Sequence, residues 1–273
     1  MRRVLFLCDR PLGIRCLEFL LTADCQICGV VSRGGEEVNW WGRSSVRNFC
    51  EEERIAWYNL SRSLIEITEE CQPDLIISVL YPKIVAKDLV KKIPCFNLHC
   101  APLPEYGGWN STLWAILNGE ETFGATLHQM SEGPDEGDII EKGSFRIPRQ
   151  VTNIELYRLS HEDGYRIFCE NVSRLISGRY SSTPQAGPRR YYGRTDLPSR
   201  EVCPEWGRER IAAYARAFYF PPFEPAYMMI EGQKIRLIPE RLGGEEILFE
   251  KRNTWAPEER TEIERGKRGK ARG

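Results

Sequence analysis

The stretch from Phe96 to Ile140 reads FNLHCAPLPEYGGWNSTLWAILNGEETFGATLHQMSEGPDEGDII, and it is the most informative part of the chain for fold and function. The apolar run IPCF, residues 93–96, predicts a buried strand that leads directly into Asn97 and His99. Alternate residues of a strand point to the same face of its sheet. We therefore expect the carboxamide and the imidazole to lie side by side at the end of this strand.

An acidic residue follows in a turn that could return to the same place. The turn Gly-Pro-Asp-Glu-Gly, residues 133–137, contains Asp135, and Asp138 competes with it for the same role. A neutral amide, a histidine and an acid suit attack on a carbonyl group, because one group binds the oxyanion and two transfer protons. The candidate catalytic residues are therefore Asn97, His99 and one of these two aspartates.

Composition limits the classes of protein that the chain can belong to. Its 273 residues are enough for one large domain and a small one. A net charge of −1 and a pI near 6.4 argue against a surface that binds nucleic acid. Asp9 and Arg10 interrupt the first apolar run well before signal-peptide length, and no stretch approaches a membrane span. We predict a cytoplasmic protein whose ten cysteines are mostly reduced.

No short motif indicates a metal or a dinucleotide. Cys25-x-x-Cys28 lacks a second cysteine pair at the spacing of a zinc site, so we predict no metal. The first turn, CDRPLG, contains only Gly13 and not the three glycines of a dinucleotide-binding loop.

Strand and helix patterns alternate along the first half of the chain. Apolar runs at residues 4–8, 27–32 and 75–80 predict strands, and helical patterns follow at 11–22 and from about residue 44. Continuous apolar strands are typical of a sheet that is covered on both faces. The pattern predicts an α/β fold of Rossmann-like architecture, with a mostly parallel sheet flanked by helices.

The second half predicts a long helix and then a smaller domain. Residues 153–176 have a helical pattern and are followed by a Pro/Gly/Ser/Arg-rich stretch, residues 178–200. We expect the helix to pack through Leu156, Leu159, Tyr165, Ile167, Val172 and Leu175. We predict a catalytic domain at 1–200, a small helix-plus-strands domain at 201–249, and a charged, disordered tail at 250–273.

An ordered series of short motifs resembles a known family. The series comprises Asn97-x-His99, Leu103-Pro104, Tyr106, Gly108, Trp114-Ala115-Ile116, Gly119-Glu120, Gly124-x-Thr126, Met130 and Asp135-x-Gly137-x-Ile139. It resembles the formyltransferases that use 10-formyltetrahydrofolate, over roughly the first 150 residues. The resemblance implies a formyl-folate donor and no metal, and it selects Asp135 rather than Asp138 as the acid.

Several branches of this family differ in the amine that they formylate. Methionyl-tRNA formyltransferases resemble the N-terminal half but carry a longer C-terminal barrel, whereas glycinamide-ribonucleotide formyltransferases open with a glycine-rich phosphate loop. Tyr191-Tyr192-x-Arg194, and Arg216-Ala217 shortly before Pro221-Pro222, look most like the sugar N-formyltransferases. That likeness implies a nucleotide-linked amino sugar destined for bacterial surface polysaccharide such as O-antigen. The nucleotide, the sugar and the position of the amine stay open, as does a homodimer.

Three other functions remain as alternatives. They are a methionyl-tRNA formyltransferase, a formyl-folate hydrolase, and a catalytically silent protein that binds folate or a nucleotide. The complete set of Asn97, His99 and Asp135 argues against the silent binder, because a protein that only binds its ligand has no need of all three.

The resemblance implies which loops face the folate, and aromatic residues in other loops near the end of the strand predict the acceptor side. The folate side comprises Leu80, Tyr81, Pro82, Lys83, Ser131, Glu132, Gly133, Pro134 and Asp135. The acceptor side comprises Arg10, Tyr106, Trp109, Asn110, Tyr191, Tyr192 and Arg194, with Trp40 and Trp41 as further loop aromatics. We expect His128 to be a packing residue and His161 to lie on the long helix, neither of them with a catalytic role.

Overall fold

The computed structural model of the chain describes residues 1–33 and 45–239. Trp40, Trp41 and the predicted tail at 250–273 lie outside these residues. The chain divides into two compact units, of which the first comprises Met1–Val151 and Glu155–Pro198. The second comprises Thr152–Ile154 and the residues from Ser199 onward. The domain boundaries suggested by the sequence stay a prediction.

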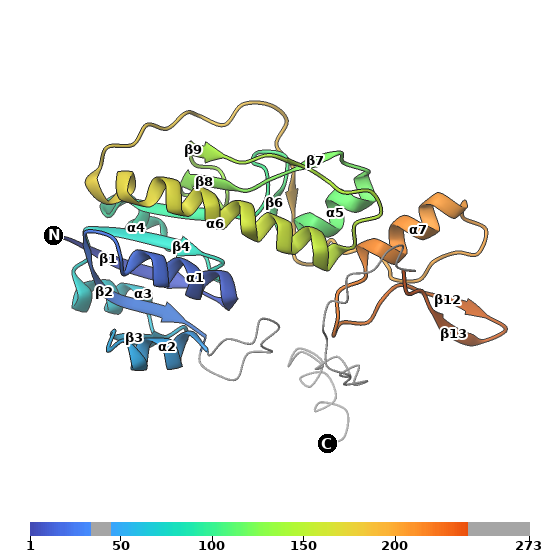
Figure 1. The fold of residues 1–273 in the computed structure, drawn as a ribbon, viewed down its shortest axis with the longest axis horizontal. Helices are drawn as coiled ribbons and strands as arrows, with labels where there is room; N and C mark the ends of the chain where they lie inside the picture. The colour runs from blue at the N-terminus through green and yellow to red at the C-terminus, as the bar shows by residue number, and fades with distance from the viewer. Residues whose placement is uncertain (34–44, 240–273) are drawn as a thin grey trace, which may run out of the picture. The chain divides into compact units, whose positions relative to one another are not determined.

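The first unit is built on a seven-stranded sheet with the order β3-β2-β1-β4-β5-β8-β9 (Figure 1). Its strands are β1 (Arg2–Cys8), β2 (Cys25–Ser32), β3 (Trp57–Asn59), β4 (Leu75–Val79), β5 (Cys95–His99), β8 (Thr126–Gln129) and β9 (Ile139–Lys142). The first five run parallel, whereas β8 is antiparallel to both β5 and β9. The predicted mostly parallel α/β sheet is confirmed.

Helices cover both faces of this sheet. They are α1 (Arg10–Leu20), α2 (Val46–Glu52), α3 (Leu64–Cys71), α4 (Lys87–Lys92) and α6 (Asn153–Ser177). The first unit also contains α5 (Ser111–Asn118). Val4 and Phe6 of β1 pack in one cluster with buried residues of α1, α2 and α6. Leu5 and Leu7 pack in another with residues of α3 and α4. This alternation explains the continuous apolar runs, because each side chain from Val4 to Cys8 is buried on one face or the other.

Short ladders complete the first unit beside the sheet. Strand β6 (Gly107–Gly108) pairs in parallel with β11 (Tyr191–Tyr192), and β7 (Thr122–Phe123) pairs antiparallel with β10 (Phe145–Arg146). Gly108 has a φ of +88°, and a Cβ there would lie 2.2 Å from the carbonyl oxygen of Tyr192. Only glycine allows the two short strands to approach this closely.

The second unit contains one helix and one hairpin among its described residues. Helix α7 (Arg208–Ala217) is followed by the antiparallel strands β12 (Tyr227–Ile230) and β13 (Gln233–Arg236). The predicted small helix-plus-strands region is confirmed. In residues 1–33 and 45–239, no helix is long and apolar enough to span a membrane.

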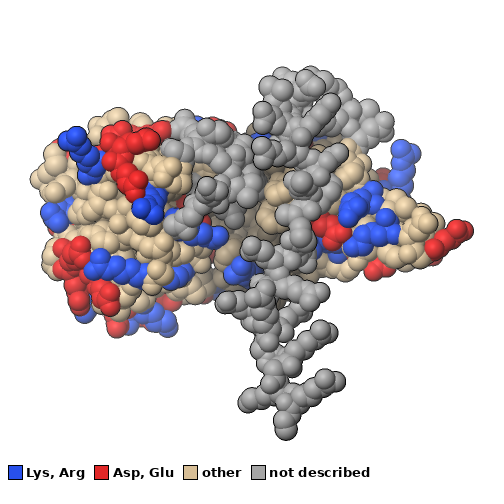
Figure 2. Space-filling view, turned by 90° about the horizontal axis from the view of Figure 1, so that it is seen from below, with Lys and Arg blue, Asp and Glu red and all other residues tan. Residues whose placement is uncertain are grey.

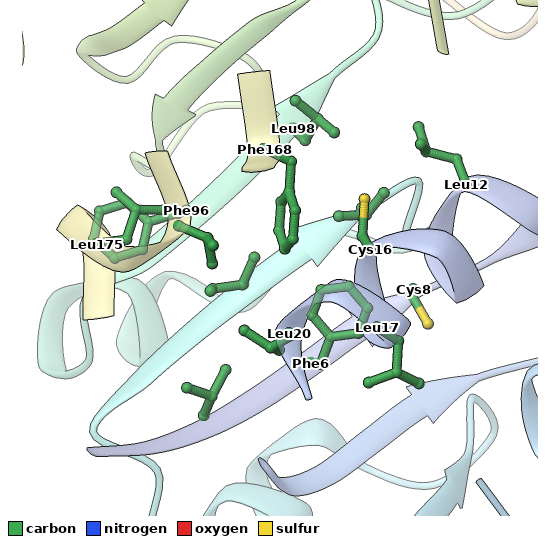
Figure 3. Packing of buried hydrophobic residues seen from close by; sticks show 14 of the residues in the cluster. Phe6, Cys8, Leu12, Cys16, Leu17, Leu20, Phe96, Leu98, Phe168 and Leu175 are labelled. Carbon is green, nitrogen blue, oxygen red and sulfur yellow. The ribbon is translucent and has the colours of Figure 1, made fainter. Parts of the chain in front are cut away.

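Helix α6 contributes the aromatic centre of the larger core. Phe168 is fully buried, with its ring 6.3 Å from that of Phe6 (Figure 3). It also lies 6.5 Å from the ring of Phe19. The other expected packing positions are buried or partly buried, except Leu159, which is 36% exposed. The expectation for Leu159 was wrong, because this side chain lies on the solvent side of the helix.

Replacing Phe168 by Ala should reduce the free energy of unfolding by about 3–5 kcal/mol, because it leaves a cavity among Phe6, Phe19 and the strands. Replacing Leu159 by Ala on the same helix should reduce it by about 1 kcal/mol or less. Urea unfolding of the two variants measures both values. Equal losses would contradict the assignment of Phe168 to the centre of the core.

Candidate active site

Asn97 lies in β5, two residues before its end, and its carboxamide is held on both sides. The hydroxyl of Ser78 donates a 2.9 Å hydrogen bond to Oδ1 of Asn97. Nδ2 of Asn97 lies 3.1 Å from Nε2 of His128. With the oxygen occupied by Ser78, the amide turns its NH2 group toward His128. One N–H of Asn97 remains for another partner.

His128 belongs to this site and is not only a packing residue, contrary to the expectation from the sequence. It lies opposite Asn97 in the antiparallel pairing of β8 with β5. Its Nδ1 is 2.6 Å from the carbonyl oxygen of Gln129. A carbonyl can only accept, so Nδ1 carries the proton and Nε2 accepts the hydrogen bond from Asn97.

The burial of His128 makes its ring neutral at physiological pH. Loss of solvation lowers the pKa of His128 to about 4, and the nearby Asp135 only partly offsets this effect. The imidazole therefore acts as a fixed neutral acceptor beside Asn97. Its role depends on the register of two strands about 30 residues apart, for which the isolated sequence ATLHQM carries no signal.

His99 presents its two ring nitrogens to different partners. Nε2 lies 2.7 Å from the carbonyl oxygen of Tyr106 and donates to it. Nδ1 lies 3.9 Å from Oδ1 of Asp135, too far for a hydrogen bond but close enough for an ion pair once the ring is protonated. Nδ1 is therefore the nitrogen of His99 that is available for proton transfer.

Asp135 is the acid that the structure brings to these histidines. Oδ2 accepts a 2.9 Å hydrogen bond from the backbone N–H of Gly108, and Oδ1 lies 3.8 Å from Nε2 of His128. Burial acts to raise the pKa of Asp135, but electrostatic interaction with His99 and His128, the Gly108 N–H and Arg189 together lower it. The carboxylate is thus ionised at neutral pH and can stabilise a positive charge on His99.

Aromatic rings gather on the predicted acceptor side. The ring of Tyr192 stacks on Trp114 at 4.8 Å and on Tyr106 at 5.7 Å. Nδ2 of Asn118 donates to the hydroxyl groups of both tyrosines, at 2.9 and 3.0 Å. The guanidinium of Arg194 lies 5.2 Å from the centre of the Trp109 ring. These contacts hold Tyr106, Tyr192, Trp109 and Arg194 in one region of the first unit.

Trp114 is a member of this aromatic group that the site assignment from the sequence omitted. Its indole nitrogen is buried and makes no hydrogen bond with any described residue. The family pattern already contained Trp114, but nothing in the sequence indicated that its ring would meet Tyr192.

The remaining acceptor-side residues are less tightly placed. Asn110 has a φ of 55° and precedes α5, with its side chain exposed. Tyr191 is also exposed, and the guanidinium of Arg189 lies 5.7 Å from its ring centre. Arg10 begins α1, and its side chain lies outside what the structure describes.

The predicted folate side consists of two loops connected through α4. Leu80, with a φ of 60°, begins the loop after β4, and Nζ of Lys83 donates to the carbonyl oxygen of Leu60 at 2.7 Å. In the other loop, Glu132 forms ion pairs with Lys87 and Lys91 of α4. The hydroxyl of Ser131 donates to the carbonyl oxygen of Gly133, and Pro134 completes this loop before Asp135. Tyr81 is partly buried against the core cluster that contains Leu89 of α4. Pro82 follows Tyr81 in the same loop.

Comparison with known proteins agrees with this geometry. Residues 44–172 match the family described as Formyl transferase. A GDP-perosamine N-formyltransferase from Brucella melitensis is 32% identical over 182 residues, which span 66% of this chain and 69% of that protein. A methionyl-tRNA formyltransferase from Clostridioides difficile is 29% identical over 188 residues, which span 64% of this chain and 60% of that protein.

A solved structure extends the similarity. The N-formyltransferase from Helicobacter canadensis, solved with folinic acid and dTDP-3-aminofucose, has a TM-score of 0.72 and 25% identity over 86% of each chain. The chain therefore belongs to the formyltransferase family. The resemblance inferred from residues 97–139 is confirmed, and so is the prediction that the protein is a formyl-transferring enzyme.

The neutral state of His128 predicts a pH-dependent stability. When the pH falls from about 6.5 to about 4, the unfolded chain binds a proton on this histidine and the folded chain does not. The free energy of unfolding should therefore fall by about 1.4 kcal/mol per pH unit on account of this group. In His128→Asn the dependence should be shallower by that amount.

Urea unfolding at a series of pH values measures this slope. The control is Ser78→Ala, which removes a hydrogen bond to the same Asn97 but keeps His128, and which should keep the wild-type slope. Identical slopes in wild type and His128→Asn would show that His128 titrates normally in the folded protein.

Proposed function

We propose that the protein transfers the formyl group of 10-formyltetrahydrofolate to the amine of a nucleotide-linked amino sugar. The observation that carries this proposal is that Asp135 lies near both His99 and His128, and that His128 contacts Asn97. The sugar acceptor is supported by the similarity to the GDP-perosamine enzyme and to the Helicobacter structure that contains a dTDP-linked amino sugar.

The mechanism begins with attack of the unprotonated sugar amine on the formyl carbon. The remaining N–H of Asn97 and a protonated Nδ1 of His99 stabilise the oxyanion of the tetrahedral intermediate. His99 then donates its proton toward N10 of the folate as the bond between N10 and the formyl carbon breaks. The nitrogen of the attacking amine gives up one proton, which returns to Nδ1 of His99, so His99 ends as it began and the protons balance. Asp135 stabilises the ring of His99 whenever it is protonated.

The two substrates approach from different loops. We assign the folate to the loops at Leu80–Lys83 and Ser131–Asp135, which offer backbone donors and acceptors to a pterin. We assign the nucleotide-linked sugar to the region of Tyr106, Trp109 and Tyr192, because aromatic faces suit a base or a sugar ring.

A methionyl-tRNA acceptor is the second candidate, because tRNA formyltransferases also match the chain. Such an acceptor calls for a large basic surface. On the face shown in Figure 2, the described acidic and basic side chains are interspersed, and the whole chain has a net charge of −1. A cytoplasmic location, a bacterial source, a homodimer and a role in O-antigen synthesis remain predictions.

The acceptor is tested with a panel of nucleotide-linked amino sugars and charged initiator tRNA, each mixed with formyl-folate. We expect formylated product, followed by mass and by folate release, with an amino sugar and not with tRNA. Trp109→Ala should weaken the binding of that nucleotide-linked sugar by about 1–3 kcal/mol and leave the affinity for folate almost unchanged.

Leu197→Ala, which removes another exposed apolar side chain of the first unit, serves as the control and should bind both ligands normally. Equal turnover with tRNA would overturn the choice of acceptor. A loss confined to folate would mean that the two sides are reversed.

Replacing His99 by Asn, or Asp135 by Asn, should lower kcat by a factor on the order of 10² or more. Each group acts mainly in the transition state, so the dissociation constants of folate and sugar should change little. Steady-state kinetics and separate ligand titrations measure the two quantities. Turnover near the wild-type value in either variant would remove that residue from the catalytic set.

A further inference from the structure

The segment from Ser182 to Tyr192, here called the crossover segment, touches both sides of the site. Near its start, Thr183 forms two backbone hydrogen bonds of 2.8 Å with Ile139 of β9. At its end, Tyr191 and Tyr192 form the ladder with β6. Figure 1 shows it as part of the long connection that leaves α6 and runs past β9 toward β6. The proposed function assigns Tyr191 and Tyr192 of this segment to the acceptor side, but the segment also contacts the loop that carries Asp135.

Gln185 makes the most specific of these contacts. Its Nε2 donates to the carbonyl oxygen of Asp135 at 2.9 Å and to that of Gly137 at 2.8 Å. The reverse orientation of the amide would place its oxygen against two carbonyl oxygens, so the NH2 group must face them. One side chain thus binds the main chain on both sides of Glu136.

The main chain at Asp135 needs such support. Asp135 has a φ of 56°, in the left-handed region, where the backbone conformation of a residue other than glycine costs about 1–2 kcal/mol. The Gly108 N–H holds one carboxylate oxygen, and nothing in that contact fixes the backbone of Asp135 itself. The hydrogen bonds of Gln185 act at the backbone and therefore fix the position of the main chain from which the Asp135 side chain extends.

A second contact from the crossover segment is weaker. Arg189 donates to the carbonyl oxygen of Pro134 at 3.1 Å and forms an ion pair with Glu136 at 2.7 Å. Both charged side chains are about two-fifths exposed, so solvent screens the pair. Gln185, whose contacts are partly buried, is the better candidate for a structural requirement.

We propose that Gln185 is a positioning residue that holds Asp135 in the geometry required for formyl transfer, an inference that rests on the proposed function. It touches neither His99 nor the reacting atoms and acts only through the Asp135 loop. The same segment carries Tyr191 and Tyr192, so the acceptor side and the acid share one piece of backbone. A displacement of the carboxylate by about 1 Å can reduce turnover by a factor on the order of 10².

Two substitutions separate hydrogen bonding from packing. Gln185→Met keeps the length of the side chain and removes both donors, and Gln185→Glu keeps the shape but places a carboxylate against two carbonyl oxygens. We expect kcat to fall by a factor of about 10 or more in both, with Glu at least as damaging as Met, and KM for both substrates to stay within a factor of about 3. Ser182→Ala, in the same segment but bonded to Gln129, should change kcat by less than a factor of about 2.

A double-mutant cycle shows whether Gln185 acts through Asp135. In an Asp135→Asn background, Gln185→Met should have almost no further effect on kcat, because the group that it positions has already lost its charge. Independent, multiplicative losses would overturn the proposal. So would wild-type turnover in Gln185→Glu, or a loss seen only in KM of the acceptor.

A readout without substrate separates this proposal from the proposed function. The amide hydrogen of Gly108, which bonds to the Asp135 carboxylate, should exchange faster in Gln185→Met than in wild type or Ser182→Ala. Unchanged exchange would contradict the role of Gln185 even if no acceptor is ever formylated. Faster exchange in a protein that formylates no amino sugar would refute the function alone. Thermal unfolding of each variant confirms that the folded protein is being compared.

Discussion

The antiparallel pairing of β5 with β8 is the constraint on which the site depends. It sets Asn97 opposite His128 and His99 opposite Thr126, so that one strand pair provides both the amide and the neutral imidazole beside it. The side-chain period of a strand is two, and a slip of one residue would turn His128 to the other face of the sheet. The return of β8 toward β9 also leads the chain into the turn that carries Asp135.

Two backbone carbonyl groups then determine where the protons are. The carbonyl of Gln129 holds a proton on Nδ1 of His128, and the carbonyl of Tyr106 holds one on Nε2 of His99. As a result, the buried histidine only accepts from Asn97, whereas the other presents Nδ1 to the ionised Asp135. Two histidines near each other thus acquire different tasks, one orienting an amide and one exchanging a proton.

The sequence alone predicts much of this fold, because local patterns encode it. The apolar runs predict the strands buried on both faces, and the helical period predicts α6 almost to its ends. The ordered motif predicts Asn97, His99 and Asp135. The contributions of His128, Trp114 and Gln185 could not be predicted, because each depends on contacts between segments far apart in the chain. A pattern within one segment does not specify strand register or the path of a Pro/Gly-rich connection.

Nitrogen-15 NMR of the histidine side chains tests this account most directly, because the protein contains only three histidines. His99→Asn and His128→Asn variants assign the signals. The account predicts that His128 carries a proton on Nδ1 alone at neutral pH and remains neutral down to about pH 5, since its pKa is about 4. Protonation of His128 near its ordinary pKa of 6.5, or a proton on Nε2 in the neutral ring, would contradict the proposed arrangement.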